Sequence, residues 1–187
     1  MIKFNNVSKS FEGKQVLESF NLTLLEGDRV CLMGPSGCGK TTVGNLLLGI
    51  LSPDEGEIFA NRDDIAAVFQ EDRLCEDFSA LSNCRMVRPD MSAPYALSVL
   101  SKLLPAEDIR KPVRTFSGGM KRRVAIARAL CADRKILLLD EPFSGLDGDT
   151  KESVAATIRE HSHGKTLLMI SHDRREAELL GAEIIEM

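Results

Sequence analysis

The stretch GPSGCGKTT at residues 34–42 decides the fold of this chain. The apolar run at residues 30–33 leads directly into it and reads as a short buried strand. Residues 41–51, which begin at the end of this stretch, have the apolar spacing of a helix that stops at Ser52-Pro53. A strand, a glycine-rich loop and a helix in this order predict a loop that binds phosphate groups.

The fixed positions of the loop each have a physical role. The stretch fits the pattern G-x-x-x-x-G-K-[ST] with Gly34, Gly39, Lys40 and Thr41. Glycines let backbone N–H groups approach phosphate oxygens, and the helix N-terminus adds partial positive charge. Lys40 is expected to reach the β- and γ-phosphates, and the Thr41 hydroxyl to hold Mg²⁺. The predicted nucleotide-binding residues here are Gly34, Pro35, Ser36, Gly37, Cys38, Gly39, Lys40, Thr41 and Thr42.

The remaining pattern predicts an α/β fold. Strands and helices alternate along much of the chain, which favours a parallel sheet covered by helices on both faces. Residues 54–56 read as a turn, and residues 76–112 carry four prolines around a helical segment, so we expect a small helical subdomain there. The chain is predicted to be a single domain over residues 1–187, with residues 1–75 and 113–187 as its core. Strands are expected at residues 2–4, 15–17, 20–25, 29–33, 64–70, 135–140, 166–171 and 182–187, and helices at 118–131, 150–161 and 174–180.

Composition narrows the class of protein. The chain has 187 residues, 43% of them hydrophobic, which suffices for a real core. A net charge of −4 gives no overall electrostatic reason to expect a nucleic acid or an anionic membrane as partner. Its five cysteines include no C-x-x-C pair, which favours a reducing cytoplasm over a disulfide framework or a zinc site. No segment approaches the roughly 18–20 apolar residues of a membrane span.

Two carboxylates end an apolar strand in ILLLDEP, residues 136–142. Successive side chains of a strand point to opposite faces, so Asp140 and Glu141 are expected to have different roles. Asp140 is the candidate Mg²⁺ ligand, acting through a water. Glu141 is the candidate general base that positions the attacking water beside the γ-phosphate.

A second Ser-Gly-Gly turn opens a basic helix in RTFSGGMKRR, residues 114–123. The phosphate loop at residues 34–42 already provides one such turn, and a single nucleotide does not need two of them in the same subunit. The basic residues around it allow a nucleic-acid patch as an alternative, but on a helix they spread over several faces, and a phosphate-facing turn would account for the first of them. They are Arg114, Lys121, Arg122, Arg123 and Arg128.

The order of these motifs resembles the ATP-binding-cassette (ABC) ATPase domain over essentially the whole chain. The resemblance implies a P-loop NTPase fold with a RecA-like, mostly parallel sheet, an N-terminal antiparallel β region and a helical subdomain that extends to the second glycine turn. It also implies ATP hydrolysis with ATP and Mg²⁺ as cofactors. Phe11 resembles the aromatic residue that stacks on adenine, although the family more often has Tyr there.

The resemblance also assigns residues outside the loop. Gln70 is similar to the glutamine that contacts Mg²⁺ and water, and His172 to the switch histidine at the γ-phosphate. Asp147 matches the D-loop in SGLD. The implied catalytic residues are Lys40, Gln70, Glu141 and His172, and the implied metal contacts are Thr41, Gln70 and Asp140.

The family's head-to-tail dimer explains the second glycine turn. Ser117, Gly118 and Gly119 match the family signature, which caps the ATP bound to the phosphate loop of the other subunit. The resemblance therefore implies a homodimer, or a pair with a second cassette, with ATP at the interface. Met120 departs from the family, which usually has Gln there.

The preferred interpretation is the ATP-binding subunit of an ABC transporter, peripheral on the cytoplasmic face of the cell membrane. An integral membrane permease would bind in a groove beside Gln70 and residues 71–90. VFQEDRL and FSALSNC at residues 68–74 and 78–84 resemble the importer group for nitrate, sulfonate and taurine. The alternatives are a soluble cassette that acts on DNA or ribosomes, disfavoured because no heptad run or second cassette is present, and a weakly hydrolysing cassette, left open by Met120.

Overall fold

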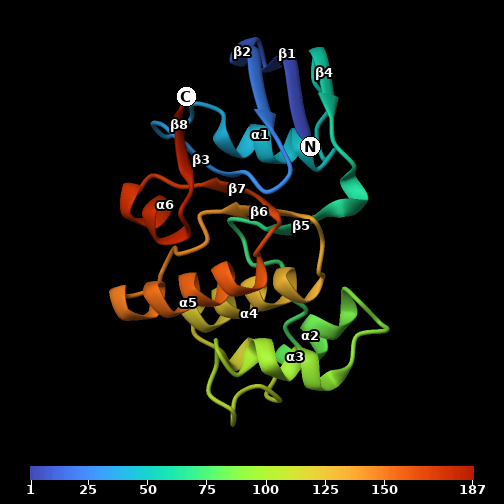
Figure 1. Ribbon diagram of the computed structural model, residues 1–187, viewed down its shortest axis with the longest axis vertical. Coiled ribbons are helices and arrows are strands. Elements are labelled where there is room, and N and C mark those ends of the chain that lie inside the picture. The colour runs from blue at the N-terminus through green and yellow to red at the C-terminus, as the bar shows by residue number, and fades with distance from the viewer.

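Two sheets and six α-helices are stacked in layers in the computed structural model, which describes residues 1–187 (Figure 1). The strands are β1 Ile2–Phe11, β2 Lys14–Leu24, β3 Arg29–Met33, β4 Glu55–Phe59, β5 Ile65–Val68, β6 Ile136–Asp140, β7 Thr166–Ile170 and β8 Glu183–Glu186. The α-helices are α1 Lys40–Leu47, α2 Ala80–Met86, α3 Ala93–Leu100, α4 Gly118–Cys131, α5 Gly148–His161 and α6 Arg174–Leu180, and two short 3-10 helices cover Arg62–Asp64 and Val113–Thr115. None of these helices has the length and apolar character needed to cross a membrane.

The central sheet has five strands in the order β5-β6-β7-β3-β8, and every neighbouring pair is parallel. All five residues of β6 and all five of β7 are buried, as expected for strands covered on both faces. Because β6, β7 and β3 are adjacent and parallel, the loops after their carboxyl ends meet at one edge of the sheet. The predicted parallel α/β core is confirmed.

The two faces of this sheet belong to different hydrophobic cores. In β6, Ile136 and Leu138 join a cluster that also contains the buried residues of α1. Leu137 and Leu139 point the other way and join a larger cluster that contains the buried residues of α4 and α5. The two-residue period of a strand thus divides one apolar run between two cores.

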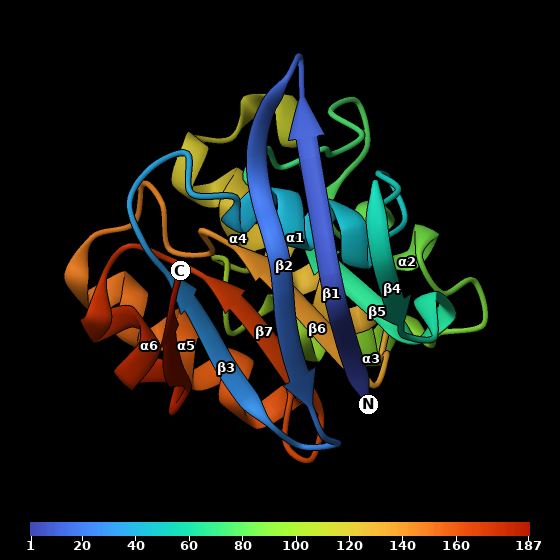
Figure 2. The same ribbon diagram turned by 90° about the horizontal axis from the view of Figure 1, so that it is seen from above.

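The antiparallel sheet, in the order β2-β1-β4, lies over α1 and the first of these cores (Figure 2). The separate apolar runs at 15–17 and 20–25 form the single strand β2. The turn predicted at residues 54–56 is wrong, because β4 begins at Glu55 and pairs with β1. Gly56 has φ +80° at an irregularity in this pairing, and an added Cβ would lie 2.2 Å from the Asn6 carbonyl oxygen. A glycine that suggests a turn in the sequence serves here as a bulge.

Helices α4, α5 and α6 cover the opposite face of the central sheet, and α2 and α3 pack beyond them on α4 (Figure 1). Helix α4 has the predicted bounds, and its apolar stripe is buried as expected. Helix α2 was not predicted; it begins after Ser79, whose hydroxyl accepts a hydrogen bond from the Ser82 N–H. The division of the chain at residues 76–112 stays a prediction.

Candidate active site

A cleft of about 430 Å³ lies where the loops after β3, β5, β6 and β7 meet. It brings together most of the residues that the motifs predicted, although they come from widely separated parts of the sequence. Val16 and Ile170 also line it, and no sequence signal singled them out. The lining residues are Phe11, Val16, Gly34, Ser36, Gly37, Gly39, Lys40, Thr41, Thr42, Gln70, Asp140, Glu141, Ile170 and His172.

The phosphate-binding loop has the backbone conformation that its glycines predict. Gly39 has φ +104°, and an added Cβ would lie 2.8 Å from a Leu17 methyl carbon, so a larger residue would be strained and crowded. The Lys40 ammonium donates to the carbonyl oxygens of Gly34 at 2.8 Å and Pro35 at 2.9 Å. The lysine is therefore folded over the loop, where it can exchange these carbonyls for phosphate oxygens. Cys38 and Pro35 belong to the loop but do not line the cleft.

Asp140 and Thr41 form an oxygen-rich corner of the cleft. Asp140 is 7% exposed, and its Oδ1 atom is buried without a hydrogen-bond partner. Burial raises the pKa of this carboxyl group, while interaction with the Thr41 hydroxyl works in the opposite direction. An unpaired carboxylate oxygen beside a hydroxyl is the donor set that a hard divalent cation such as Mg²⁺ prefers. The residues at this corner therefore fit the predicted metal.

Glu141 and His172 contact each other across the cleft, which the motifs did not predict. His172 Nδ1 lies 3.1 Å from Glu141 Oε1, and the Glu141 N–H donates to the Ile170 carbonyl at 2.9 Å. The hydrogen bond to Glu141 raises the pKa of His172, whose side chain is 76% exposed. Glu141 directly follows β6 and His172 comes two residues after the end of β7, and because these two parallel strands are neighbours, residues 31 positions apart meet.

Asp140 and Glu141 do not point to opposite faces as the strand period suggests, since both line the same cleft. Glu141 has φ +49°, a left-handed conformation that interrupts the alternation just after β6 ends at Asp140. The two carboxylates still have different neighbours, Thr41 for Asp140 and His172 for Glu141. Their predicted division of roles is compatible with this geometry even though the reason given for it was wrong.

The predicted signature and D-loop residues lie outside the cleft. Ser117 caps α4, with its Oγ accepting from the Met120 N–H at 3.3 Å. Asp147 caps α5, accepting from the Thr150 N–H at 2.9 Å, and this hydrogen bond lowers the pKa of Asp147. The two motifs are neighbours, because a Cβ on Gly119 would lie 3.3 Å from the Gly145 carbonyl oxygen. The chain thus presents a second glycine turn that its own cleft does not use.

Comparison with known proteins gives the family. Residues 17–144 match the family described as ABC transporter. The chain belongs to this family. The predicted recognition, P-loop ABC fold and ATPase class are thereby confirmed.

Among the relatives of this ABC cassette are ATP-binding proteins of importers. It is 34% identical to the taurine import ATP-binding protein TauB of Roseobacter denitrificans, covering 100% of the chain and 77% of that protein. It is 32% identical to the Fe(3+) ions import ATP-binding protein FbpC of Escherichia coli, of which it spans 59%. Relatives named for different cargoes are about equally similar, so these identities do not separate one importer group from another.

Solved ABC cassettes have the same fold. The dimeric structure of MJ0796, a bacterial ABC transporter cassette, superimposes with a TM-score of 0.90 at 32% identity, covering all of this chain and 94% of that one. A dimeric post-hydrolysis state of the same cassette, bound to ADP and Pi, gives a TM-score of 0.88.

Proposed function

We propose that this cassette binds ATP with Mg²⁺, closes on a second copy of itself with the nucleotides at the interface, and hydrolyses ATP to drive a separate membrane permease. The observation that carries the proposal is the division of the predicted site. The phosphate loop, both carboxylates and His172 share one cleft, whereas the signature turn lies outside it. A second copy could supply that turn.

Within the cleft, each group has a role that its surroundings support. The backbone of the phosphate loop and Lys40 bind the phosphates, and the Phe11 ring, 40% exposed at the end of β1, offers a face for the adenine. Thr41 and Asp140 would hold Mg²⁺, with Gln70 as a further contact. When bound, the metal neutralises negative charge on the phosphates.

Glu141 is the proposed general base. Its carboxylate lines the cleft, so it can accept a proton from a water that attacks the γ-phosphate. Without nucleotide, the hydrogen bond with His172 orients this carboxylate. His172 is largely exposed and remains free to turn toward a phosphate oxygen, with a raised pKa that favours its cationic form.

The second copy would complete the site through α4. Helix α4 has no acidic residue in its first turn, and the N–H groups of its first turn lack intrahelical carbonyl partners by geometry. With the Ser117 hydroxyl, they form an end of the helix that attracts an anion. The γ-phosphate of an ATP bound to the partner's phosphate loop would be such an anion.

A permease would bind the helical region that contains α2. A groove of about 660 Å³ is lined there by Phe78, Ser79, Leu81, Ser82, Arg85, Met86, Pro89 and Arg110. Phe78 and Met86 are 51% and 45% exposed. Exposed apolar side chains beside arginines suit a short amphipathic segment of a membrane protein. A cassette bound to such a permease would be peripheral on the cytoplasmic face of the membrane.

The dimer can be tested directly. Glu141→Gln keeps the shape of the cleft but removes the base, so with ATP and Mg²⁺ it should elute from gel filtration as a dimer. Lys40→Ala, which removes a phosphate contact, should stay monomeric under the same conditions. A Glu141→Gln variant that binds ATP and remains monomeric would contradict the shared site.

A further inference from the structure

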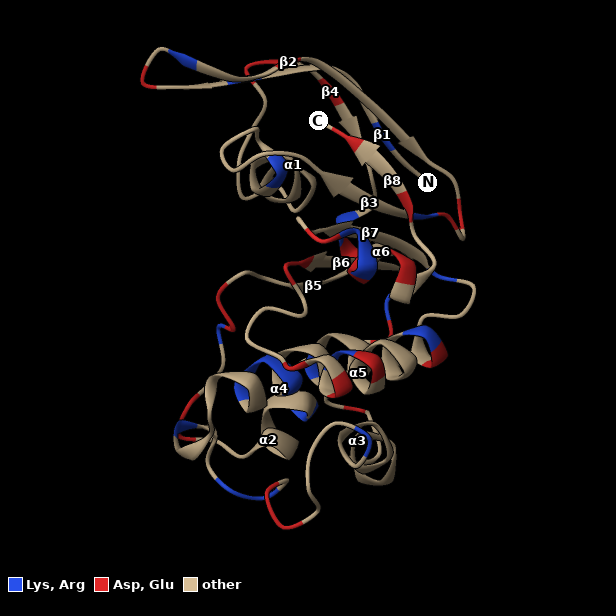
Figure 3. Cartoon of the chain, turned by 90° about the vertical axis from the view of Figure 1, so that its left-hand side faces the viewer, with Lys and Arg blue, Asp and Glu red and all other residues tan.

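Several Lys and Arg positions lie on α4 (Figure 3). Four of the five basic residues in and just before this helix contact one segment of the chain, residues 69–77: Arg114, Lys121, Arg122 and Arg128. The fifth, Arg123, donates to the Leu103 carbonyl oxygen at 2.8 Å instead. Arg128 donates to the carbonyl oxygens of Arg73 at 2.8 Å and Asp72 at 3.2 Å. Lys121 pairs with Glu76, and Arg114 pairs with Asp77 at 2.9 Å. Within the single chain, carboxylates and loop carbonyls therefore engage these residues, and the expectation that the first of them belong to a phosphate-facing turn stays a prediction.

Arg122 makes the most buried of these contacts and reaches Gln70 itself. The residue is 5% exposed, and its Nη1 and Nη2 atoms donate to the carbonyl oxygens of Phe69 at 2.6 Å and Gln70 at 2.5 Å. Asp72 Oδ1 lies 3.3 Å from Nη1 and balances the buried charge. The Arg73 guanidinium stacks over the Phe69 ring at 4.0 Å from its centroid.

The planar guanidinium group of an arginine is suited to holding two neighbouring carbonyl oxygens at once. Two successive carbonyls held by one guanidinium restrict the backbone on both sides of residue 70, and hence the direction in which its side chain leaves the chain. A lysine is a point charge and cannot hold two carbonyls in a fixed geometry. Gln70 lines the cleft two residues after the end of β5, where no regular structure holds it.

We propose that Arg122 is a positioning residue for Gln70, and that α4 thereby links the signature turn of a subunit to that subunit's own nucleotide cleft. The second half rests on the proposed function, in which Gln70 contacts the metal and the signature turn meets the partner's nucleotide. Ser117 caps α4, and Arg122 lies five residues further along the same helix, about 7.5 Å at 1.5 Å per residue. A shift of the helix end on closure would reach Gln70 through one rigid element.

The first test measures hydrogen exchange of residues 69–77 in the full chain without nucleotide. Arg122→Ala should increase exchange there on the order of tenfold, because charge-assisted hydrogen bonds that order the loop are lost. Arg122→Gln, which keeps a donor and most of the side-chain volume, should show a smaller increase and covers the case in which the alanine variant fails to fold. Arg114→Ala is the control, because its ion pair is exposed on both sides.

The second test measures the Mg²⁺ concentration that gives half-maximal ATP hydrolysis, together with ATP affinity in EDTA. Arg122→Ala should raise the Mg²⁺ requirement on the order of tenfold and leave metal-free ATP affinity unchanged. In a Gln70→Ala background the same substitution should have no further effect, because it acts through Gln70. Arg114→Ala should match the unmodified chain.

The outcomes separate this inference from the proposed function. Unchanged exchange at residues 69–77 in both Arg122 variants, or effects of Arg122→Ala and Gln70→Ala that simply add, would overturn the positioning role while leaving the ATPase intact. An unmodified chain that does not hydrolyse ATP would overturn the proposed function and the metal link, whereas the exchange result would still decide whether Arg122 holds the Gln70 loop.

Discussion

The contact between Glu141 and His172 makes the protonation of one residue depend on the other. A carboxylate 3.1 Å from the imidazole stabilises its cationic form, which is why the pKa of His172 is raised. A group whose pKa is higher in the folded than in the unfolded state stabilises the fold fully at a pH below its unfolded pKa, which is about 6.5 for histidine. This contribution to the free energy of unfolding is lost as the pH rises through the pKa of the folded state. The pair therefore weakens at alkaline pH.

Replacement of Glu141 by Gln should lower the pKa of His172 toward its ordinary value, because the amide carries no negative charge. An NMR titration of the histidine ring protons measures this directly in the nucleotide-free chain. His161 and His163 serve as internal controls, since neither belongs to the contact. An identical titration of His172 in both forms would mean that the two side chains do not meet in solution.

For individual residues, a sequence motif predicts the role in the site well when the residues of the motif act together within one short segment. The phosphate loop was predicted because nine consecutive residues fold into a single cradle. The contact between Glu141 and His172 was not, because it depends on β6 and β7 being neighbours, and the sequence does not state the strand order. The left-handed conformation of Glu141 could not be predicted either, because such conformations are usually signalled by a glycine and this residue is a glutamate.

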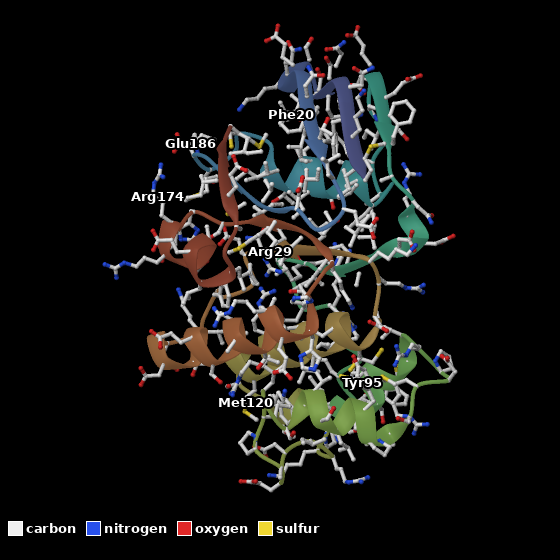
Figure 4. All side chains as sticks on the ribbon, viewed as in Figure 1. Phe20, Arg29, Tyr95, Met120, Arg174 and Glu186 are labelled. Atoms are coloured by element: carbon white, nitrogen blue, oxygen red, sulfur yellow. The ribbon has the colours of Figure 1, made fainter.

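Among the elements, α4 has three roles. Its apolar stripe packs in the larger core, three of its basic side chains contact residues 69–77, and Ser117 caps its first turn. Met120, labelled in Figure 4, is partly buried against the same core while its N–H donates to Ser117, so its side chain serves packing in the isolated chain. The cap and the proposed nucleotide contact thus coincide at Ser117.

Substitution of Ser117 can separate these two roles. Ser117→Ala should lower the free energy of unfolding by about 1 kcal/mol, because the N-cap hydrogen bond is lost. Ser117→Asp should retain stability, since aspartate is an equally good N-cap, but should prevent the ATP-dependent dimer through repulsion of phosphate. Urea unfolding and gel filtration in the Glu141→Gln background measure the two effects. Dimers of the aspartate variant would show that this turn does not meet nucleotide.

The elements that the sequence missed have weak local signals. Strand β4 is an edge strand with a glycine bulge, and no residue in it is fully buried, so the pattern of its side chains carries little information. Helix α2 has seven residues, too few to show helical periodicity clearly. By contrast, β6 and β7 are uninterrupted apolar runs and α4 is a 14-residue amphipathic helix, so their burial can be predicted from the sequence.

The whole molecule depends on one sheet for both of its cores. Leu168 of β7 lies in the cluster under the antiparallel sheet, and Leu167 in the cluster under α4 and α5. The helices at residues 76–112 have no separate core, since the buried side chains of α2 and α3 belong to the same cluster as Leu137 and Leu139 of β6. Unfolding of α2 and α3 would therefore expose apolar surface of α4, and unfolding of either layer next to the sheet would expose the sheet itself.

This arrangement predicts a single unfolding transition for the nucleotide-free chain. Leu100→Ala in α3 and Leu168→Ala in β7 remove fully buried side chains from the two different cores, and each should cost about 2–5 kcal/mol. Both should shift the same transition, because the cores share the sheet. Calorimetry and circular dichroism on the two variants test this. An early, separate transition in Leu100→Ala alone would show that residues 76–112 unfold as an independent subdomain, and that the continuous cluster does not couple them to the sheet.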